Sequence, residues 1–145
     1  MGIEIERKFL VAGDGWRSGE GMRLRQGYLN RAPERTVRVR IAGERAFLAV
    51  KGLATGAVRA EFEYEIPAAE AEALLRLCEG TILDKTRHVV LFEGFRWEID
   101  EFHGRHEGLV LAEIELSRPD EEFPRPPWLG PEVTGDPRYF NSSLA

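Results

Sequence analysis

Three charged residues near the N-terminus, Glu4, Glu6 and Lys8, occupy every second position of a stretch that otherwise has the pattern of a β-strand. Side chains two positions apart on a strand point to the same face, so two carboxylates and one ammonium line up at intervals of about 7 Å. Such a row could ligate a metal ion and contact an anion. It could equally lie on the solvated face of a sheet, and the rest of the chain decides between the two.

The same alternation of charged and apolar residues returns in later strand-like segments, and charges of one sign gather by segment. Acids occur at 4–6, 61–65 and 113–115, and bases at 38–40 and 85–87. An antiparallel sheet with one wet face would explain any single segment. Together, however, the segments are rich in Arg, Glu and Asp and poor in the Thr, Ser and Lys of ordinary sheet surfaces. The alternative is a barrel whose charged face lines a lumen and whose apolar face packs against helices outside it.

A lumen that holds so many carboxylates needs compensating positive charge. Two carboxylates about 4 Å apart repel each other by roughly 4 kcal/mol at an effective dielectric constant near 20. The bases of the chain offset part of this repulsion, and hard divalent cations would offset the rest; sites made of oxygen ligands favour Mg²⁺, Mn²⁺ or Ca²⁺ over Zn²⁺. Arg and Lys that face these acids across a small space suit an anion with several charges, such as a polyphosphate.

Eight strand-like segments must position these side chains, and their mostly sequential order predicts an antiparallel meander. Closing it into a barrel would remove its edges. One helix interrupts the strands, beginning at Pro67 and ending by Gly80, and a short helical turn is expected at 14–17. The proline-rich segment 119–145 shows no clear strand and is expected to wrap or plug the body. The expected strands lie near 2–11, 22–30, 36–42, 45–52, 58–66, 83–93, 94–102 and 109–117.

The composition predicts one domain over residues 1–145 in a reducing compartment. The net charge is −5, with 20 basic and 25 acidic residues, which argues against nucleic-acid binding. The single cysteine, Cys78, excludes an intrachain disulfide. No apolar run approaches the roughly 20 residues of a membrane span, and the N-terminal residues lack the pattern of a secretory signal. We therefore expect a cytoplasmic protein that contacts neither a membrane nor nucleic acid, with a homodimer as a candidate assembly.

The segment Glu4-Ile5-Glu6-Arg7-Lys8 resembles the ExExK signature of the CYTH superfamily, the triphosphate tunnel metalloenzymes. Further matching segments follow in order along nearly the whole chain, and the tail at 132–141 resembles the ending of short bacterial members. These segments are Gln26-Gly27-Tyr28-Leu29, Arg38-Val39-Arg40, Lys51-Gly52, Glu61-Phe62-Glu63, Lys85-Thr86-Arg87, Trp97-Glu98-Ile99-Asp100-Glu101-Phe102 and Glu113-Ile114-Glu115.

The resemblance implies a mainly β fold, an eight-stranded antiparallel β-barrel tunnel with a charged lumen and a few flanking helices. It implies that Mg²⁺ or Mn²⁺ is held by the acids Glu4, Glu6, Asp100, Glu113 and Glu115. The triphosphate would contact the bases Lys8, Arg38, Arg40, Lys51, Lys85 and Arg87. Catalytic roles are expected for Lys85 and for Glu61 and Glu63, which would serve a second metal ion or the attacking water. No definite role follows for Arg25, Arg59, Glu65, Arg96 and Glu98.

The function expected from this resemblance is metal-dependent hydrolysis of inorganic tripolyphosphate to pyrophosphate and phosphate. An enzyme of the same family acting on an organic triphosphate is the first alternative: a class IV adenylate cyclase, a thiamine triphosphatase or a nucleoside triphosphatase. A non-catalytic polyphosphate-binding module is the second, although such a module could lose signature acids that are all present here. A sheet with only a solvated charged face is the structural alternative to all of these.

Overall fold

The computed structural model describes residues 2–17 and 21–145, which are mostly β-structure with short helical segments. The helical segments in this part of the chain are α1 (Ala68–Leu75), α2 (Asn141–Leu144) and the 3₁₀ turns η1 (Gly104–His106) and η2 (Pro137–Tyr139). The strands are β1 (Gly2–Val11), β2 (Gly21–Asn30), β3 (Arg35–Ala42), β4 (Arg45–Gly52), β5 (Val58–Ile66), β6 (Glu79–Phe92), β7 (Phe95–Phe102), β8 (Val110–Glu115) and β9 (Leu129–Glu132).

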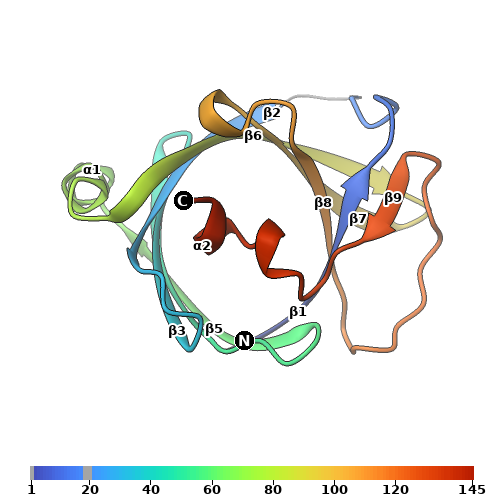
Figure 1. The fold of residues 1–145 in the computed structure, drawn as a ribbon, viewed down its shortest axis with the longest axis horizontal. Helices are drawn as coiled ribbons and strands as arrows, with labels where there is room; N and C mark the ends of the chain where they lie inside the picture. The colour runs from blue at the N-terminus through green and yellow to red at the C-terminus, as the bar shows by residue number, and fades with distance from the viewer. Residues whose placement is uncertain (1, 18–20) are drawn as a thin grey trace.

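Strands β1 to β8 close into an antiparallel barrel, as predicted (Figure 1). The order around the ring is β1, β5, β4, β3, β2, β6, β7 and β8. Closure depends on the pairing of β1 with β5, in which Gly2 faces Glu61 and Ile5 faces Val58. Each described strand of the ring therefore has a neighbour on both sides, which removes most of the free strand edge at which other chains could associate.

The strand order is less sequential than the predicted meander. Two meanders, β2 to β5 and β6 to β8, are joined by the pairing of β2 with β6 and by β1, which lies between β5 and β8. The tail also forms the short strand β9 on β1, where no strand was predicted. A side chain at Gly130 would place its Cβ 2.8 Å from the carbonyl oxygen of Leu10, so this glycine permits the close approach.

Helix α1 is shorter than predicted, because it ends at Leu75 and β6 already begins at Glu79. The residues between them form a tight turn in which the amide of Cys78 donates to the carbonyl of Leu75. At 14–17, where a short helical turn was expected, the amide of Arg17 donates to the carbonyl of Asp14 and closes one hydrogen-bonded turn. This turn does not continue into a helix.

The apolar core lies mainly outside the ring of strands. One cluster covers the outer face of β1, β7 and β8, where Phe9 and Trp97 pack against Trp128 and Phe123 of the segment that precedes β9. A second cluster lies between α1 and the outer face of β3 and β4. With the apolar faces of these strands turned outward, the alternation along them directs the charged faces inward.

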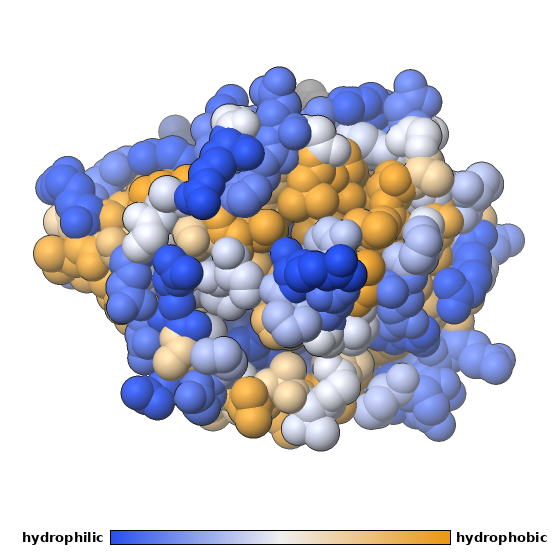
Figure 2. Space-filling model, viewed as in Figure 1, coloured by the Kyte–Doolittle hydropathy of each residue, from blue (hydrophilic) through white to orange (hydrophobic). Residues whose placement is uncertain are grey.

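The C-terminal segment enters the ring of strands (Figure 1). Val133, Leu144 and Ala145 pack there against Tyr28 and neighbouring apolar residues of β6, β7 and β8. In the same view, apolar residues are visible among the hydrophilic residues on this face of the molecule (Figure 2). The expectation that the tail wraps or plugs the body is confirmed: β9 lies along β1, and the end of the tail fills one part of the lumen. The charged residues line the part of the lumen that the tail leaves open. None of the helices described is long and apolar enough to cross a membrane.

Candidate functional site

A cavity of about 230 Å³ occupies the charged part of the lumen. The structure brings every predicted site residue except Asp100 to its wall, although these residues come from six strands spread over the chain. The cavity is lined by Glu4, Glu6, Lys8, Tyr28, Thr36, Arg38, Arg40, Lys51, Arg59, Glu61, Glu63, Lys85, Arg87, Glu98, Glu113, Glu115, Phe140, Asn141 and Ser142.

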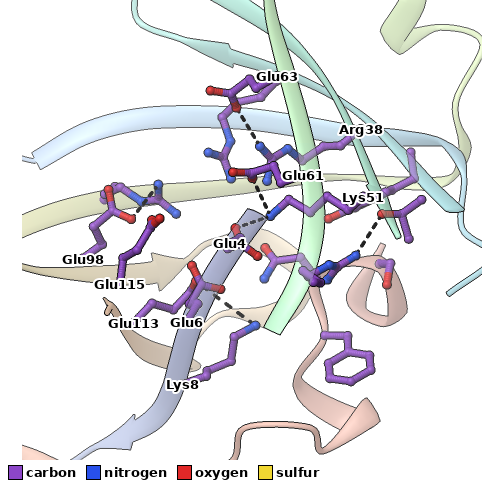
Figure 3. A pocket seen from close by; sticks show the side chains of 18 of the residues that line it. Glu4, Glu6, Lys8, Arg38, Lys51, Glu61, Glu63, Glu98, Glu113 and Glu115 are labelled. Carbon is purple, nitrogen blue, oxygen red and sulfur yellow. Dashed lines mark hydrogen bonds and ion pairs between the residues drawn. The ribbon is translucent and has the colours of Figure 1, made fainter. Parts of the chain in front are cut away.

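One side of the cavity is an acidic wall formed by β1, β7 and β8 (Figure 3). In the strand register Glu6 lies directly opposite Glu115, and Glu98 lies directly opposite Glu113. Like charges that face each other across a strand pair destabilise a sheet, so this wall carries stored repulsion. The acidic wall consists of Glu4, Glu6, Glu98, Glu113 and Glu115.

The ionisation of the acidic wall is uneven. Burial and the neighbouring carboxyl group of Glu113 raise the pKa of Glu6 well above its usual value of 4.5. Burial would also raise the pKa of Glu113, but the ammonium of Lys8 and the hydrogen bond with Glu6 outweigh it and hold this pKa below the usual range. The two carboxyl groups therefore share a proton that a cation could replace.

The bases of the cavity form a basic wall carried by β3, β4 and β6, of which β6 is the direct neighbour of β7. This wall consists of Arg38, Arg40, Lys51, Lys85 and Arg87. Burial and the nearby guanidinium groups of Arg38 and Arg87 lower the pKa of Arg40 to about 9. Burial likewise lowers the pKa of Lys85 to about 7, although Asp100 opposes this effect. An anion in the cavity would stabilise the charged forms of these bases.

Carboxylates hold several of these bases in place. The ammonium of Lys51 lies 2.8 Å from Glu4 and 3.1 Å from Glu61, and a guanidinium nitrogen of Arg38 lies 3.1 Å from Glu63 (Figure 3). The Nε of Arg38 is buried and has no hydrogen-bond partner among the described residues. An anion between the walls would satisfy this donor.

Asp100 lies behind the basic wall and not on the cavity surface. The residue is 1% exposed, and its carboxylate accepts hydrogen bonds from the guanidinium of Arg87 at 2.8 and 2.9 Å. The ammonium of Lys85 lies 2.7 Å from its second oxygen. Burial alone would raise the pKa of Asp100, but Lys85 and Arg87 hold it well below the usual range. In this arrangement Asp100 orients two bases.

The acidic wall is the part of the site that suits a divalent cation. Within residues 2–17 and 21–145, no three His, Cys, Asp or Glu side chains are gathered closely enough to hold an ion on their own. The shared proton of Glu6 and Glu113 and the opposed pair Glu6 and Glu115 nevertheless mark a place where positive charge is needed. These ligands are all carboxylate oxygens, which suit Mg²⁺ or Mn²⁺, with the remaining positions filled by water or phosphate oxygens.

The cavity includes residues that received no role from the sequence. The alternation along β5 and β7 already placed Arg59 and Glu98 on the charged faces, and Tyr28 lay inside a matching segment. Asn141 lay inside the matching tail at 132–141 but received no role there, and Ser142 lay just outside it. Three residues left without a role do not line the cavity. Arg25 pairs with Glu72 of α1, Glu65 pairs with exposed Arg45, and exposed Arg96 pairs with Glu98, which itself lines the cavity.

Comparisons with known proteins match this architecture over the whole chain. A family model described as the CYTH domain matches residues 2–140. A protein of Acetivibrio thermocellus named inorganic triphosphatase is 51% identical, covering 99% of this chain and 94% of its own length. A protein of Nitrosomonas europaea with the same name is 40% identical, covering 98% of this chain and 96% of its own length.

Solved structures agree at the level of fold. The crystal structure of an inorganic triphosphatase superimposes with a TM-score of 0.69 at 39% identity, covering 98% of this chain and 93% of that chain. A putative adenylate cyclase from Bacillus halodurans superimposes with a TM-score of 0.64, covering 82% of this chain and 84% of that chain. Its identity is only 17%, so this second likeness concerns the fold alone.

Proposed function

This chain belongs to the CYTH family, and we propose that it hydrolyses inorganic tripolyphosphate to pyrophosphate and orthophosphate with Mg²⁺ or Mn²⁺ as cofactor. Its two full-length relatives are both named inorganic triphosphatase, which supports this substrate. The observation that carries the proposal is the lumen cavity itself, in which the five bases of the basic wall and the five acids of the acidic wall line one space. A triphosphate is the kind of anion that needs many cationic donors on one side and metal-binding oxygens on the other.

The acidic wall is the proposed metal site. Glu4, Glu6, Glu113 and Glu115 would hold the cation, and Asp100 would support the site indirectly by fixing Lys85 and Arg87. A divalent cation bound at this wall would neutralise the carboxylates and polarise phosphate oxygens. The proton shared by Glu6 and Glu113 would leave when the cation binds.

The carboxylates on β5 are proposed to act on the attacking water. Burial would raise the pKa of Glu61, but Lys51 outweighs it and lowers the pKa, so Glu61 is ionised at neutral pH. It can therefore accept a proton as water attacks a terminal phosphorus atom. Glu63, two residues along the same face, would orient the water or Arg38. The bond from the attacked phosphorus to its bridging oxygen breaks, and pyrophosphate leaves.

The basic wall, together with Lys8, is proposed to bind the triphosphate and to stabilise the charge that develops during transfer. The Arg38, Arg40 and Arg87 side chains offer planar forks of donors to phosphate oxygens. Lys85 has a pKa of about 7, so it can hold or give up a proton near neutral pH. It is therefore the base of this wall suited both to phosphate binding and to proton transfer.

A phosphate-release panel tests this proposal directly. It compares tripolyphosphate, ATP, thiamine triphosphate, pyrophosphate and long-chain polyphosphate with Mg²⁺ or Mn²⁺, and includes a measurement of cyclic AMP. We expect a preference for tripolyphosphate and no cyclic product. A preference for ATP with cyclic product would instead identify a cyclase, and tripolyphosphate binding without turnover of any substrate would identify a binding module.

Two substitutions connect the panel to the site. Glu4→Gln should abolish turnover because it removes a charged oxygen ligand from the acidic wall. Arg38→Ala should weaken both turnover and substrate binding because it removes a fork of donors. Arg45→Ala is the matched control, since Arg45 forms an exposed ion pair with Glu65 outside the cavity. Full activity in both site variants would refute the placement of the reaction in this cavity.

A further inference from the structure

A second cavity of about 190 Å³ adjoins the lumen cavity where the tail enters the barrel. Thr36, Arg59, Phe140 and Ser142 line both cavities and so mark the passage between them. Arg59 comes from β5, on the same inward face as Glu61 and Glu63. Thr36 comes from β3, on the inward face that also carries Arg38.

Arg59 differs from the neighbouring bases in its partners. Arg38 and Lys51 are both ion-paired with carboxylates of β1 or β5. In the part of the chain that the structure describes, no carboxylate forms an ion pair with Arg59; its one side-chain hydrogen bond goes from Nη2 to the Thr36 hydroxyl at 3.2 Å. Its Nε is buried and has no hydrogen-bond partner among these residues.

A buried guanidinium donor without an acceptor is unfavourable, and an anion in the passage would satisfy it. The guanidinium group offers donors in a planar fork that matches two phosphate oxygens. Thr36 is 3% exposed, and its hydroxyl oxygen already accepts from Arg59. Its own hydroxyl hydrogen is therefore free to point at the same anion.

We propose that Arg59 and Thr36 form a phosphate subsite at the passage between the two cavities. The subsite takes a phosphate group, either the terminal phosphoryl of tripolyphosphate or free orthophosphate. Arg59 precedes Glu61 by two residues on β5, and Thr36 precedes Arg38 by two residues on β3. Each is therefore displaced by about 7 Å along its strand, towards the second cavity. This inference rests on the proposed function for the identity of the anion, but the subsite itself is argued from the unpaired guanidinium.

Binding of inorganic phosphate alone, without metal, tests the subsite. Orthophosphate is titrated calorimetrically into the full chain and into Arg59→Gln, Arg59→Lys, Thr36→Val and the control Arg45→Gln. We expect affinity to fall by about tenfold or more in Arg59→Gln, in line with the loss of hydrogen bonds to a charged group. Arg59→Lys should retain part of the affinity, because it keeps the charge and loses the fork. Unchanged affinity in both Arg59→Gln and Thr36→Val would overturn the proposal.

Steady-state kinetics separates the two sources of the phosphate group. If the subsite holds the terminal phosphoryl, Arg59→Gln raises the KM for tripolyphosphate by about tenfold or more. If it holds only the product, KM is unchanged and inhibition by added orthophosphate weakens instead. Both results support the subsite, whereas no change in either quantity refutes it. A wild-type protein that hydrolyses no tripolyphosphate would refute the proposed function, while the orthophosphate titration would still decide the subsite.

The denaturant midpoint of unfolding, measured for each variant, distinguishes a loss of phosphate affinity from a loss of folded protein. Arg59 forms no ion pair with a described carboxylate, so Arg59→Gln should unfold at the same denaturant concentration as the wild type. If Arg59→Gln nevertheless fails to fold, the milder Arg59→Lys and Thr36→Val decide the outcome: lower orthophosphate affinity with an unchanged midpoint supports the subsite, and unchanged affinity overturns it.

Discussion

The side-chain oxygen of Asn141 accepts a hydrogen bond of 2.8 Å from the ammonium of Lys85, 56 residues away in the chain. The same oxygen accepts a bond of 3.0 Å from the amide of Gln26, whose own oxygen accepts from Arg40. Lys85 and Gln26 are both fully buried. The tail therefore not only fills one part of the lumen but also completes a hydrogen-bond network that holds the basic wall.

Replacing Asn141 by Leu should destabilise the protein and impair substrate binding together. The substitution keeps the size of the side chain but leaves the Gln26 amide without its acceptor and the Lys85 ammonium with Asp100 alone, which costs about 1–3 kcal/mol. Urea unfolding measures the stability, and KM for tripolyphosphate measures the second effect. Ser143→Ala, at an exposed position of the same helix, is the control. If Asn141→Leu behaved as this control does, the network would not hold the basic wall.

Replacing Asp100 by Asn should be far more destabilising than removing a surface carboxylate. Arg87 would keep a buried charge without the carboxylate that compensates it, and Lys85, whose pKa is about 7 even with Asp100 present, would lose its proton. Together these changes cost about 3–5 kcal/mol. The control is Asp84→Asn, which breaks the exposed ion pair with Arg23 and should cost less than about 1 kcal/mol. The loss at Asp100 should persist in the presence of a metal chelator. A loss seen only when metal is present would make Asp100 a metal ligand instead.

Metal-free protein should lose stability as the pH rises above the usual pKa of glutamate. Burial and Glu113 raise the pKa of Glu6 well above 4.5, so the folded state keeps a proton that the unfolded state releases. Because the folded state then binds more protons, the free energy of unfolding falls with increasing pH until the raised pKa is passed. Urea unfolding in the presence of a chelator, from pH 4.5 upward, measures this slope.

The variant Glu6→Gln isolates this effect, since it cannot titrate. Its stability should be flatter than that of the wild type between pH 4.5 and about 7, whereas exposed Glu44→Gln should follow the wild type. Lys85 contributes the opposite slope above pH 7: its folded pKa of about 7 lies below its usual value of 10.5, so the unfolded state binds more protons there. Parallel profiles for Glu6→Gln and wild type below pH 7 would contradict the shared proton.

A methyl group at Gly27 should overpack the junction between β2, β6 and the turn after α1. A Cβ at this position would lie 2.7 Å from Cδ1 of Ile82 and 2.9 Å from Sγ of Cys78. Overpacking of this kind costs about 1–3 kcal/mol. Ile82→Val removes the nearer methyl group and should restore part of the stability lost in Gly27→Ala. Strictly additive unfolding free energies for the two substitutions would show that this contact is not the cause.

The alternation of residue types was enough to predict which side chains share a face. Glu4, Glu6 and Lys8 lie on one face of β1 because successive side chains of any strand point in opposite directions. The same local rule placed Arg38 with Arg40 and Lys85 with Arg87. The resemblance to the CYTH superfamily supplied the closed barrel, and the structure confirms both the barrel and its charged lumen.

The positions that local pattern could not supply are those that depend on contacts between distant segments. Asn141 reaches Lys85 only because the tail enters the ring, and nothing in a short window of sequence encodes that path. Asp100 is on the same face of its strand as the cavity residue Glu98, but Lys85 and Arg87 pack over it and separate it from the cavity. Whether a side chain on that face reaches the cavity depends on such contacts with other strands.

By itself, the sequence determined the strands of the barrel, their charged faces and the family to which the chain is similar. The tertiary structure decided which face became the interior, through the pairing of β1 with β5, and which acids meet bases and which meet each other. The physical reason is range: side-chain direction along a strand is a local property of the backbone, whereas burial, ion pairing and pKa depend on atoms brought together from across the chain.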